Sequence, residues 1–229
     1  MSAALGQGPT VWRGMTQALL DAEYDQRTLV PDLGPHTADW ANWSAAVRQA
    51  YPCKTLIYGA APEETVDVFL GAGDGPVHLH FHGGAWRAMS KRDAHFVVAG
   101  LGPLARAVAL ADFGLAPEVR LTKIAAQVRA AAARLIREHG QISISGHSSG
   151  AHLTSLLLDR RWWAEAGVSA AQIRWVLLAS GPYDLEPVRL SSRNLYLTLT
   201  PEEVGALSVR HHLAQELPPI AVVWADGEL

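Results

Sequence analysis

The second half of the chain alternates between two hydrophobic patterns. Short apolar runs fit buried strands, and longer segments with apolar residues at every third or fourth position fit helices. The expected strands are "VHLHF" (77–81), "AVALADF" (107–113), "ISIS" (142–145), "IRWVLLAS" (173–180) and "IAVVWA" (220–225). The expected helices cover 92–104, 118–139 and a segment that begins at Ser149. This alternation predicts a mostly parallel sheet with helices on both faces.

The segment 118–139 carries the clearest helical pattern. Pro117 stands before it and Gly140 follows it, as is typical of the two ends of a helix. Its apolar residues form one stripe, made of Ile124, Val128, Ala131 and Leu135. We therefore expect a long helix that packs one face against the sheet.

The region before residue 77 predicts a helix followed by two strands. Apolar residues between 37 and 50 are spaced as on one face of a helix. The runs "KTLIYG" (54–59) and "TVDVFLG" (65–71) then fit strands joined by the turn "AAPEE". A length of 229 residues fits one α/β domain, so we expect residues 1–229 to form a single domain.

Composition narrows the class of protein. The net charge is −3 and the 19 lysines and arginines are scattered, so we expect no nucleic-acid partner. No apolar run is long and clean enough to span a bilayer, so we expect no membrane association. The single cysteine, Cys53, excludes an intrachain disulfide, and the N-terminus lacks the pattern of a secretory signal. Together these features predict a cytoplasmic protein.

Ser148 lies in a Gly-x-Ser-x-Gly pentapeptide, "GHSSG", between the expected strand "ISIS" and a helical pattern. This pentapeptide predicts a nucleophilic serine only in a strand, sharp turn, helix context, which the flanking sequence supplies. Gly146 and Gly150 would let strand and helix pack closely around the turn. The N–H group of Ser149 would lie where a carbonyl oxygen becomes negative. We expect Ser148 to be a nucleophile rather than a serine in a plain glycine turn.

The segment "HFHGGAW" (80–86) follows the expected strand 77–81, where a loop that donates to an oxyanion is expected in such folds. Gly83 and Gly84 would allow the backbone to approach a substrate closely. Two glycine-rich loops in this order, each after a strand, favour a hydrolytic site over two unrelated turns.

Three segments, "GHSSGAHL", "HGGAW" and "SGPYDLEP" (180–187), together resemble the α/β-hydrolase superfamily, and most closely its kynurenine formamidase (arylformamidase) branch. That branch carries an H-G-G-x-W motif, matched by residues 82–86, and a G-H-S-x-G-x-H motif, matched by residues 146–152. The resemblance extends to "YDQRTLVPD", "LAPEVRL" and "LSSRNLYLTL", and so covers most of the chain.

The resemblance implies an α/β-hydrolase fold and hydrolysis of the formamide of N-formyl-L-kynurenine, a small-molecule substrate of tryptophan catabolism. Ser148 would attack the formyl carbon, and no metal or organic cofactor would be needed. The N–H groups that would hold the oxyanion belong to Gly83, Gly84, Ala85 and Ser149. His82 and Trp86 would contribute to substrate binding. His82 would order the loop, and Trp86 would either form an aromatic wall of the substrate pocket or be a buried structural residue.

The catalytic acid is expected directly after the strand 220–225, because the triad in this fold runs in the order Ser, Asp or Glu, then His. Asp226 and Glu228 both lie there, and the family pattern favours Glu228. Asp184, after the strand 173–180, is a third candidate. Asp226 and Glu228 could each instead belong to a solvated turn, and in the formamidase pattern Asp184 is a structural loop residue.

No histidine follows the acid in the sequence. We expect the chain to lack a final strand, the catalytic histidine and a closing helix, so that the base lies beyond Leu229. Alternatively His211 or His212 could act as base, although their place before the last strand is more typical of loop residues. The sheet edge left by the absent strand could also be paired by another subunit in a homodimer.

The alternating His78, His80 and His82 could in principle hold a metal, since all three would face one side of a strand. A metal site normally needs further ligands and acidic residues that support the ligands, and the segment instead continues directly into the oxyanion loop, so we expect no metal site here. Two further functions stay open beside the formamidase: a short-chain carboxylesterase of the same fold, and a non-catalytic ligand-binding relative that lacks the triad histidine.

Overall fold

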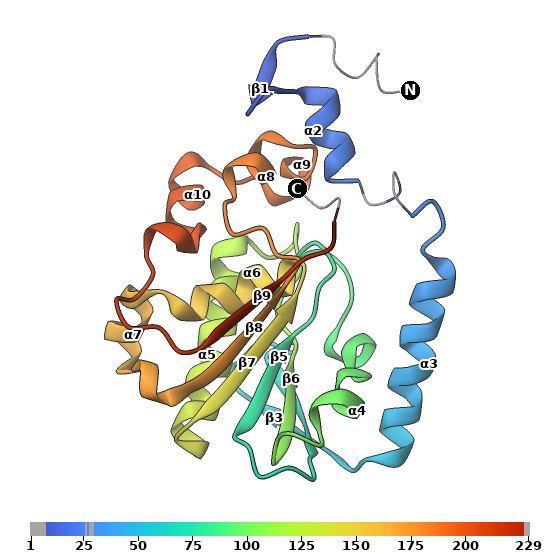
Figure 1. The fold of residues 1–229 in the computed structure, drawn as a ribbon, viewed down its shortest axis with the longest axis vertical. Coiled ribbons are helices and arrows are strands. Elements are labelled where there is room, and N and C mark those ends of the chain that lie inside the picture. The colour runs from blue at the N-terminus through green and yellow to red at the C-terminus, as the bar shows by residue number, and fades with distance from the viewer. Residues whose placement is uncertain (1–7, 26, 28–29, 227–229) are drawn as a thin grey trace.

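A computed structural model describes residues 8–25, 27 and 30–226 of the chain. A seven-stranded sheet forms its centre, in the order β3-β4-β6-β5-β7-β8-β9. The strands are β3 (Cys53–Ile57), β4 (Thr65–Leu70), β5 (Val77–Phe81), β6 (Ala107–Ala111), β7 (Ile142–His147), β8 (Ile173–Ala179) and β9 (Ile220–Val223). β3 and β4 pair antiparallel, β4 also runs antiparallel to β6, and the pairs from β6 to β9 are parallel. This is the mostly parallel sheet that the hydrophobic pattern predicts (Figure 1).

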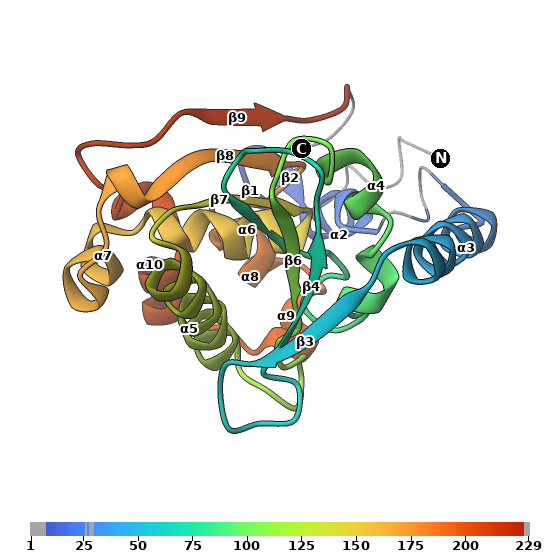
Figure 2. The same ribbon diagram turned by 90° about the horizontal axis from the view of Figure 1, so that it is seen from below.

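Helices cover both faces of the sheet, and Figures 1 and 2 place α3 and α4 on one side and α5, α6, α7 and α10 on the other. The helices are α2 (Gln17–Glu23), α3 (Gly34–Ala50), α4 (Val97–Leu101), α5 (Leu121–His139), α6 (Ser149–Ser155), α7 (Arg160–Ala166), α8 (Glu186–Leu190), α9 (Asn194–Leu197) and α10 (Pro201–Leu207). Short 3-10 helices are η2 (Lys91–Ala94), η3 (Leu156–Leu158), η4 (Ala170–Gln172) and η5 (Val209–His211). A two-stranded ribbon, β1 (Thr10–Trp12) with β2 (Met15–Thr16), precedes α2.

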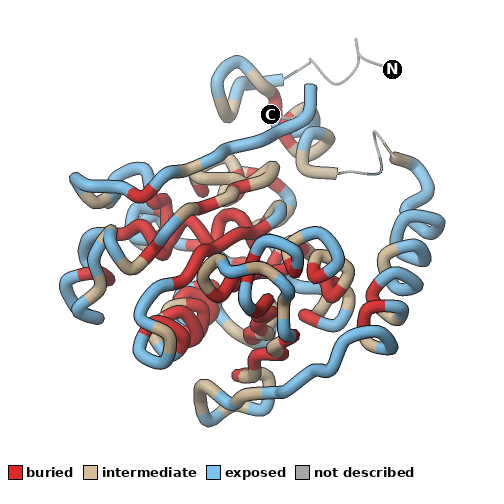
Figure 3. Tube along the Cα trace, turned by 60° about the horizontal axis from the view of Figure 1, so that its bottom comes forward, coloured by how far each residue is buried: buried red, intermediate tan, exposed pale blue. Residues whose placement is uncertain are grey.

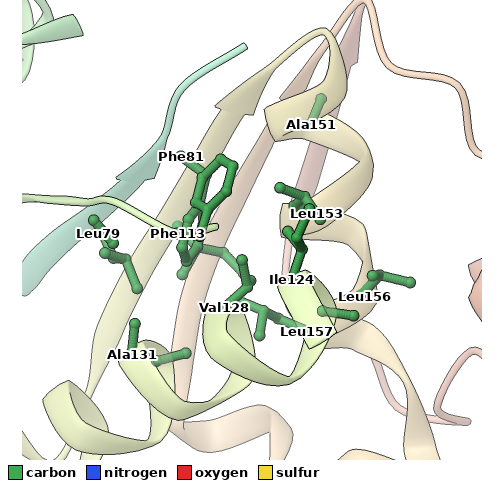
Figure 4. Packing of buried hydrophobic residues seen from close by; sticks show 14 of the residues in the cluster. Leu79, Phe81, Phe113, Ile124, Val128, Ala131, Ala151, Leu153, Leu156 and Leu157 are labelled. Atoms are coloured by element: carbon green, nitrogen blue, oxygen red, sulfur yellow. The ribbon is translucent and has the colours of Figure 1, made fainter. Parts of the chain in front are cut away.

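The core lies mainly between the sheet and α5. The predicted stripe of α5, Ile124, Val128, Ala131 and Leu135, is fully buried. It packs against Leu79 and Phe81 of β5 and against the leucines of α6 and η3, as Figure 4 shows. A smaller cluster on the opposite face joins Val47 of α3 and Val98 of α4 to β4 and β6. β5 is buried along its whole length because helices cover both of its faces.

The expected helix 92–104 is wrong in extent. The chain forms η2 and then α4, which ends at Leu101 with Gly102 as its C-cap. Ser90 and Asp93 form a capping box at the start of η2, and Lys91 turns inward to a cluster of charged side chains. Pro103 follows the C-cap residue Gly102 and cannot continue the helix, so the expected end at residue 104 is not reached.

β9 forms one edge of the sheet, and its last residues are largely exposed (Figure 3). Val222 is 46% and Val223 48% exposed, and Trp224, just past the strand, is 71% exposed. Within the described ranges, every helix is too short or too polar to cross a membrane.

Candidate active site

Ser148 occupies the sharp turn between β7 and α6. Its backbone has φ 56° and ψ −125°, a conformation that costs energy for any residue other than glycine. The turn is held in place because Ser148 N–H donates to Ala179 O at 2.8 Å, while Ser148 O accepts from Ala151 N–H at 2.9 Å. The half-buried serine therefore lies at the carboxyl end of β7, in the strand, turn, helix context that the sequence predicts.

The two glycines of the pentapeptide allow β7 and α6 to approach each other. A Cβ on Gly146 would collide with the Gly150 carbonyl and with Thr154. A Cβ on Gly150 would collide with the carbonyl groups of Phe81 and His82. Larger residues at either position would push α6 away from the sheet and displace the serine.

The loop after β5 lies directly against this turn. A Cβ built on Gly83 would be 3.4 Å from Ser148 Cβ and 3.1 Å from His147 O. Three consecutive residues have positive φ angles: 105° at Gly84, 54° at Ala85 and 60° at Trp86. Such a run is unfavourable for residues with side chains, so the surrounding contacts must hold it.

Hydrogen bonds fix the carbonyl groups of this loop. His82 Nδ1 donates to Gly83 O at 2.7 Å, Tyr196 Oη donates to Ala85 O at 3.1 Å, and Ala116 N–H donates to Trp86 O at 2.8 Å. Because a peptide group is planar and trans, each fixed carbonyl also fixes the N–H of the next residue on the opposite side. Of the N–H groups whose direction is set in this way, that of Gly84 is one of the expected donors to the oxyanion.

The side chain of Trp86, the last residue of this loop, is fully buried. Its indole N–H donates to His152 Nδ1 at 3.2 Å, and His152 Nε2 donates to Leu207 O at 3.0 Å. Burial lowers the pKa of His152 to about 4, so its ring is neutral and serves as an acceptor for the indole. Of the two roles kept for Trp86, this burial favours the structural one.

His82 also lies beneath the loop and is 2% exposed. Its ring stacks on Phe113, with centroids 4.4 Å apart, and Nε2 lies 3.6 Å from Asp112 Oδ1. Burial lowers the pKa of His82, while the Gly83 carbonyl and the Asp112 charge act in the opposite direction. This position fits the ordering role expected for His82, in support of the loop backbone.

His78 and His80 face a buried polar layer of the sheet. His78 bonds Ser143 Oγ at 2.9 Å and Ser145 Oγ at 2.7 Å, and His80 bonds the same Ser145 hydroxyl at 2.8 Å. Burial lowers the pKa of both imidazoles to about 3. In the part of the chain that the structure describes, no group of three or more His, Cys, Asp or Glu residues is placed to hold a metal ion.

Asp226 is exposed and follows β9, whereas Glu228 lies outside the described residues. Asp184 forms an ion pair with Arg210 at 3.0 Å and accepts from Glu186 N–H. His211 is bonded to Arg210, and His212 is bonded to Gly205 O at 2.8 Å, so both histidines have local partners. Among residues 8–25, 27 and 30–226, none forms a hydrogen bond with the Ser148 hydroxyl.

Sequence reasoning missed the contribution of α8 and α9, which lie beside the site. Tyr196 of α9 bonds the Ala85 carbonyl, and the Arg87 guanidinium lies 4.6 Å from the centre of the Tyr196 ring. The N-terminal helix α2 braces the same region, since Asp21 accepts from Ser192 N–H and Arg193 donates to Tyr24 O. No local periodicity identifies Tyr196, because its partner is 111 positions away.

Comparison with known proteins places this geometry among hydrolases. The family described as the alpha/beta hydrolase fold matches residues 78–225. A kynurenine formamidase of Danio rerio is 30% identical over 217 residues, covering 89% of this chain and 73% of the fish protein. One of Salmo salar is 30% identical over 178 residues, and this chain spans only 58% of its length.

Solved structures agree on the fold. A proposed thioesterase from a Silicibacter species superposes with a TM-score of 0.81 at 28% identity, covering 91% of this chain and 81% of that protein. Carboxyl esterase 2 of Tuber melanosporum gives a TM-score of 0.61 at 18% identity, covering 77% of this chain and 67% of that one.

Proposed function

Because this chain belongs to the α/β-hydrolase family and is related to the kynurenine formamidases, we propose that it hydrolyses the formamide of N-formyl-L-kynurenine or a related aryl formamide. The observation that carries this proposal is the contact between two segments remote in sequence. The backbone of Gly83, in a loop of fixed carbonyl groups, lies against the strained Ser148 turn. This contact supports the proposal, because it would bring a serine nucleophile and backbone donors to an oxyanion to one place.

In the proposed reaction, the Ser148 hydroxyl attacks the formyl carbon and a base takes its proton. N–H groups of Gly83, Gly84, Ala85 and Ser149 stabilise the negative charge on the formyl oxygen. The C–N bond then breaks, the arylamine leaves with a proton, and a formyl ester remains on Ser148. Water attacks this ester, and formate and free Ser148 are released.

The chemistry of the buried histidines restricts the choice of base. His78, His80 and His152 are buried with both low pKa values and existing partners, which makes them poor acceptors for the Ser148 proton. We propose a histidine oriented by Glu228 or Asp226 as the base, in the order that this fold uses. His211 and His212 would have to leave their local partners to serve.

A second candidate activity is the hydrolysis of short-chain esters. The solved relatives named above include a carboxyl esterase, and a loop that holds an oxyanion serves an ester as well as a formamide. The formamidase is preferred because the formamidase relative of Danio rerio is 30% identical over 89% of this chain, against 18% for the esterase.

The test compares the hydrolysis of N-formyl-L-kynurenine with that of p-nitrophenyl acetate by the 229-residue chain. We expect a higher kcat/KM for the formamide and loss of turnover in Ser148→Ala, with Ser192→Ala, at an exposed position, as the control variant that retains activity. Faster hydrolysis of the acetate would favour the esterase. Binding without turnover, together with no labelling of Ser148 by a fluorophosphonate, would refute both and favour the non-catalytic relative.

A further inference from the structure

The Arg87 side chain lies against Tyr196, beside the loop 82–86. Its guanidinium carbon lies over the Tyr196 ring, 4.6 Å from the ring centre, and the hydroxyl of the same ring donates to Ala85 O at 3.1 Å. The Arg87 backbone N–H donates to Gly84 O at 3.0 Å, so the chain turns back directly after the loop. A cation over an aromatic ring is attracted to it, and this contact holds the exposed guanidinium next to the loop.

The charge of Arg87 is not neutralised by a carboxylate among residues 8–25, 27 and 30–226. Carboxylates in the neighbouring segment 184–203 form ion pairs with other arginines: Asp184 with Arg210, Glu186 with Arg189 and Glu203 with Arg120. The side-chain N–H groups of Arg87 also form no hydrogen bond within these described ranges. They are therefore available to an anion that enters the site.

A second guanidinium, that of Arg193, adds positive charge at the same place. Its Nε and Nη2 atoms donate to Tyr24 O at 3.3 and 3.0 Å, a contact that joins α9 to the N-terminal helix α2 (Figure 1). Burial raises the pKa of Tyr196, and the charges of Arg193 and Arg87 both oppose that rise because both lie near this phenol. Two cations around one ring favour the approach of an anion.

We propose that Arg87, held on the Tyr196 ring, binds a carboxylate at the remote end of the substrate and gives the site its specificity for anionic substrates. A planar guanidinium can donate a pair of parallel N–H bonds to one carboxylate. N-formyl-L-kynurenine has such a group, since its amino acid arm ends in a carboxylate several bonds from the formyl carbon. The inference rests on the proposed function, because it assumes that the formyl group lies between Ser148 and the loop.

The first test is the binding of two ligands that differ only in the carboxylate. L-Kynurenine, the product of the proposed reaction, carries this group, whereas kynuramine, the corresponding decarboxylated amine, lacks it. Isothermal titration calorimetry with the full chain measures the dissociation constant of each compound. We expect L-kynurenine to bind about tenfold more tightly than kynuramine. Equal affinity for the two, or no measurable binding of either, would overturn the proposal.

Two methionine variants test whether Arg87 is the source of this preference. Arg87→Met keeps a long side chain against Tyr196 but removes the charge and the donors, so the two dissociation constants should become similar. Arg137→Met, at an exposed position near the end of α5, is the matched control and should keep the wild-type preference. A preference for L-kynurenine that survives Arg87→Met would overturn the proposal.

The role of the Tyr196 ring is tested separately from that of its hydroxyl. Tyr196→Phe keeps the ring beneath the guanidinium, so the preference for L-kynurenine should remain. Tyr196→Leu removes the ring as well, and the preference should fall about threefold because the guanidinium is no longer held in place. Equal preferences in these two variants would overturn the assignment of the ring as the surface that positions Arg87.

Turnover separates this proposal from the formamidase activity itself. The substrates are N-formyl-L-kynurenine and N-formylkynuramine, its decarboxylated analogue with the formyl group on the same arylamine. Arg87→Met should raise KM for the first about tenfold, with kcat and the second substrate unaffected. A chain that hydrolyses neither substrate, but loses its preference for L-kynurenine in Arg87→Met, would refute the formamidase and support the carboxylate site. Equal hydrolysis of both substrates, before and after Arg87→Met, would do the reverse.

Discussion

Acid should destabilise this fold through three histidines that are buried in the neutral form. Burial lowers the pKa of His78 and His80 to about 3 and that of His152 to about 4, against 6.5 for an unperturbed imidazole. Below pH 6.5 the unfolded chain therefore binds protons that the folded chain does not. The stabilisation is complete above pH 6.5 and is lost as the pH falls toward the folded pKa values.

The size of the effect follows from these pKa values. Between pH 7 and pH 5 each of the three histidines should lower the free energy of unfolding by about 2 kcal/mol, or roughly 6 kcal/mol in total. Asp112 acts in the opposite direction, because burial raises its pKa and the folded chain takes up that proton first. A net loss of several kcal/mol is a large share of the roughly 5–15 kcal/mol that stabilises a typical domain.

Urea unfolding at pH steps from 7.5 to 5, followed by circular dichroism, measures this loss. His152→Gln is the informative variant, because glutamine can still accept from the Trp86 indole and donate to Leu207 O. Its stability should fall less steeply with pH than that of the wild type, by about 2 kcal/mol over the range. His36→Gln, at an exposed position of α3, is the matched control. Equal pH dependence in His152→Gln and the wild type would refute the reasoning.

Two further substitutions test the packing around the site. Tyr196→Phe removes the hydrogen bond to Ala85 O, so we expect the free energy of unfolding in urea to fall by about 1 kcal/mol. We also expect kcat to fall by more than KM changes. An unchanged kcat would show that this hydrogen bond does not affect the function of the loop. Asp159→Ala removes the side chain that caps α7 and pairs with Arg129 at 2.9 Å and with Arg161 at 2.6 Å. We expect the free energy of unfolding, measured by thermal or urea unfolding, to fall by about 3 kcal/mol because the ion pairs are partly buried. A loss below about 1 kcal/mol would show that these ion pairs do not stabilise the fold.

The parts of the fold that the sequence predicts are those with a local pattern. β5 and the α5 stripe are buried where their periodicity places them, because burial of a helix face or a strand repeats every few residues. Ser148 is found for the same reason, since strand, turn and helix are consecutive. The short helices α8 and α9 have 5 and 4 residues, too few to show a period.

The supporting contacts of the site are not local in the sequence. Lys91 pairs with Asp67 in an earlier strand, and its burial reverses the usual expectation for a lysine flanked by polar residues. Tyr196 reaches the Ala85 carbonyl from a helix far along the chain. Such pairs depend on which elements become neighbours in the fold, and they cannot be predicted from the hydrophobic pattern around either residue.

The edge formed by β9 affects how the protein will behave at high concentration. Its four residues, "IAVV", include no charged residue and no proline, the features by which edge strands usually avoid pairing with other chains. Exposed Val222, Val223 and Trp224 add apolar surface along the same line. Concentrated samples of the 229-residue chain should therefore be prone to strand-mediated association.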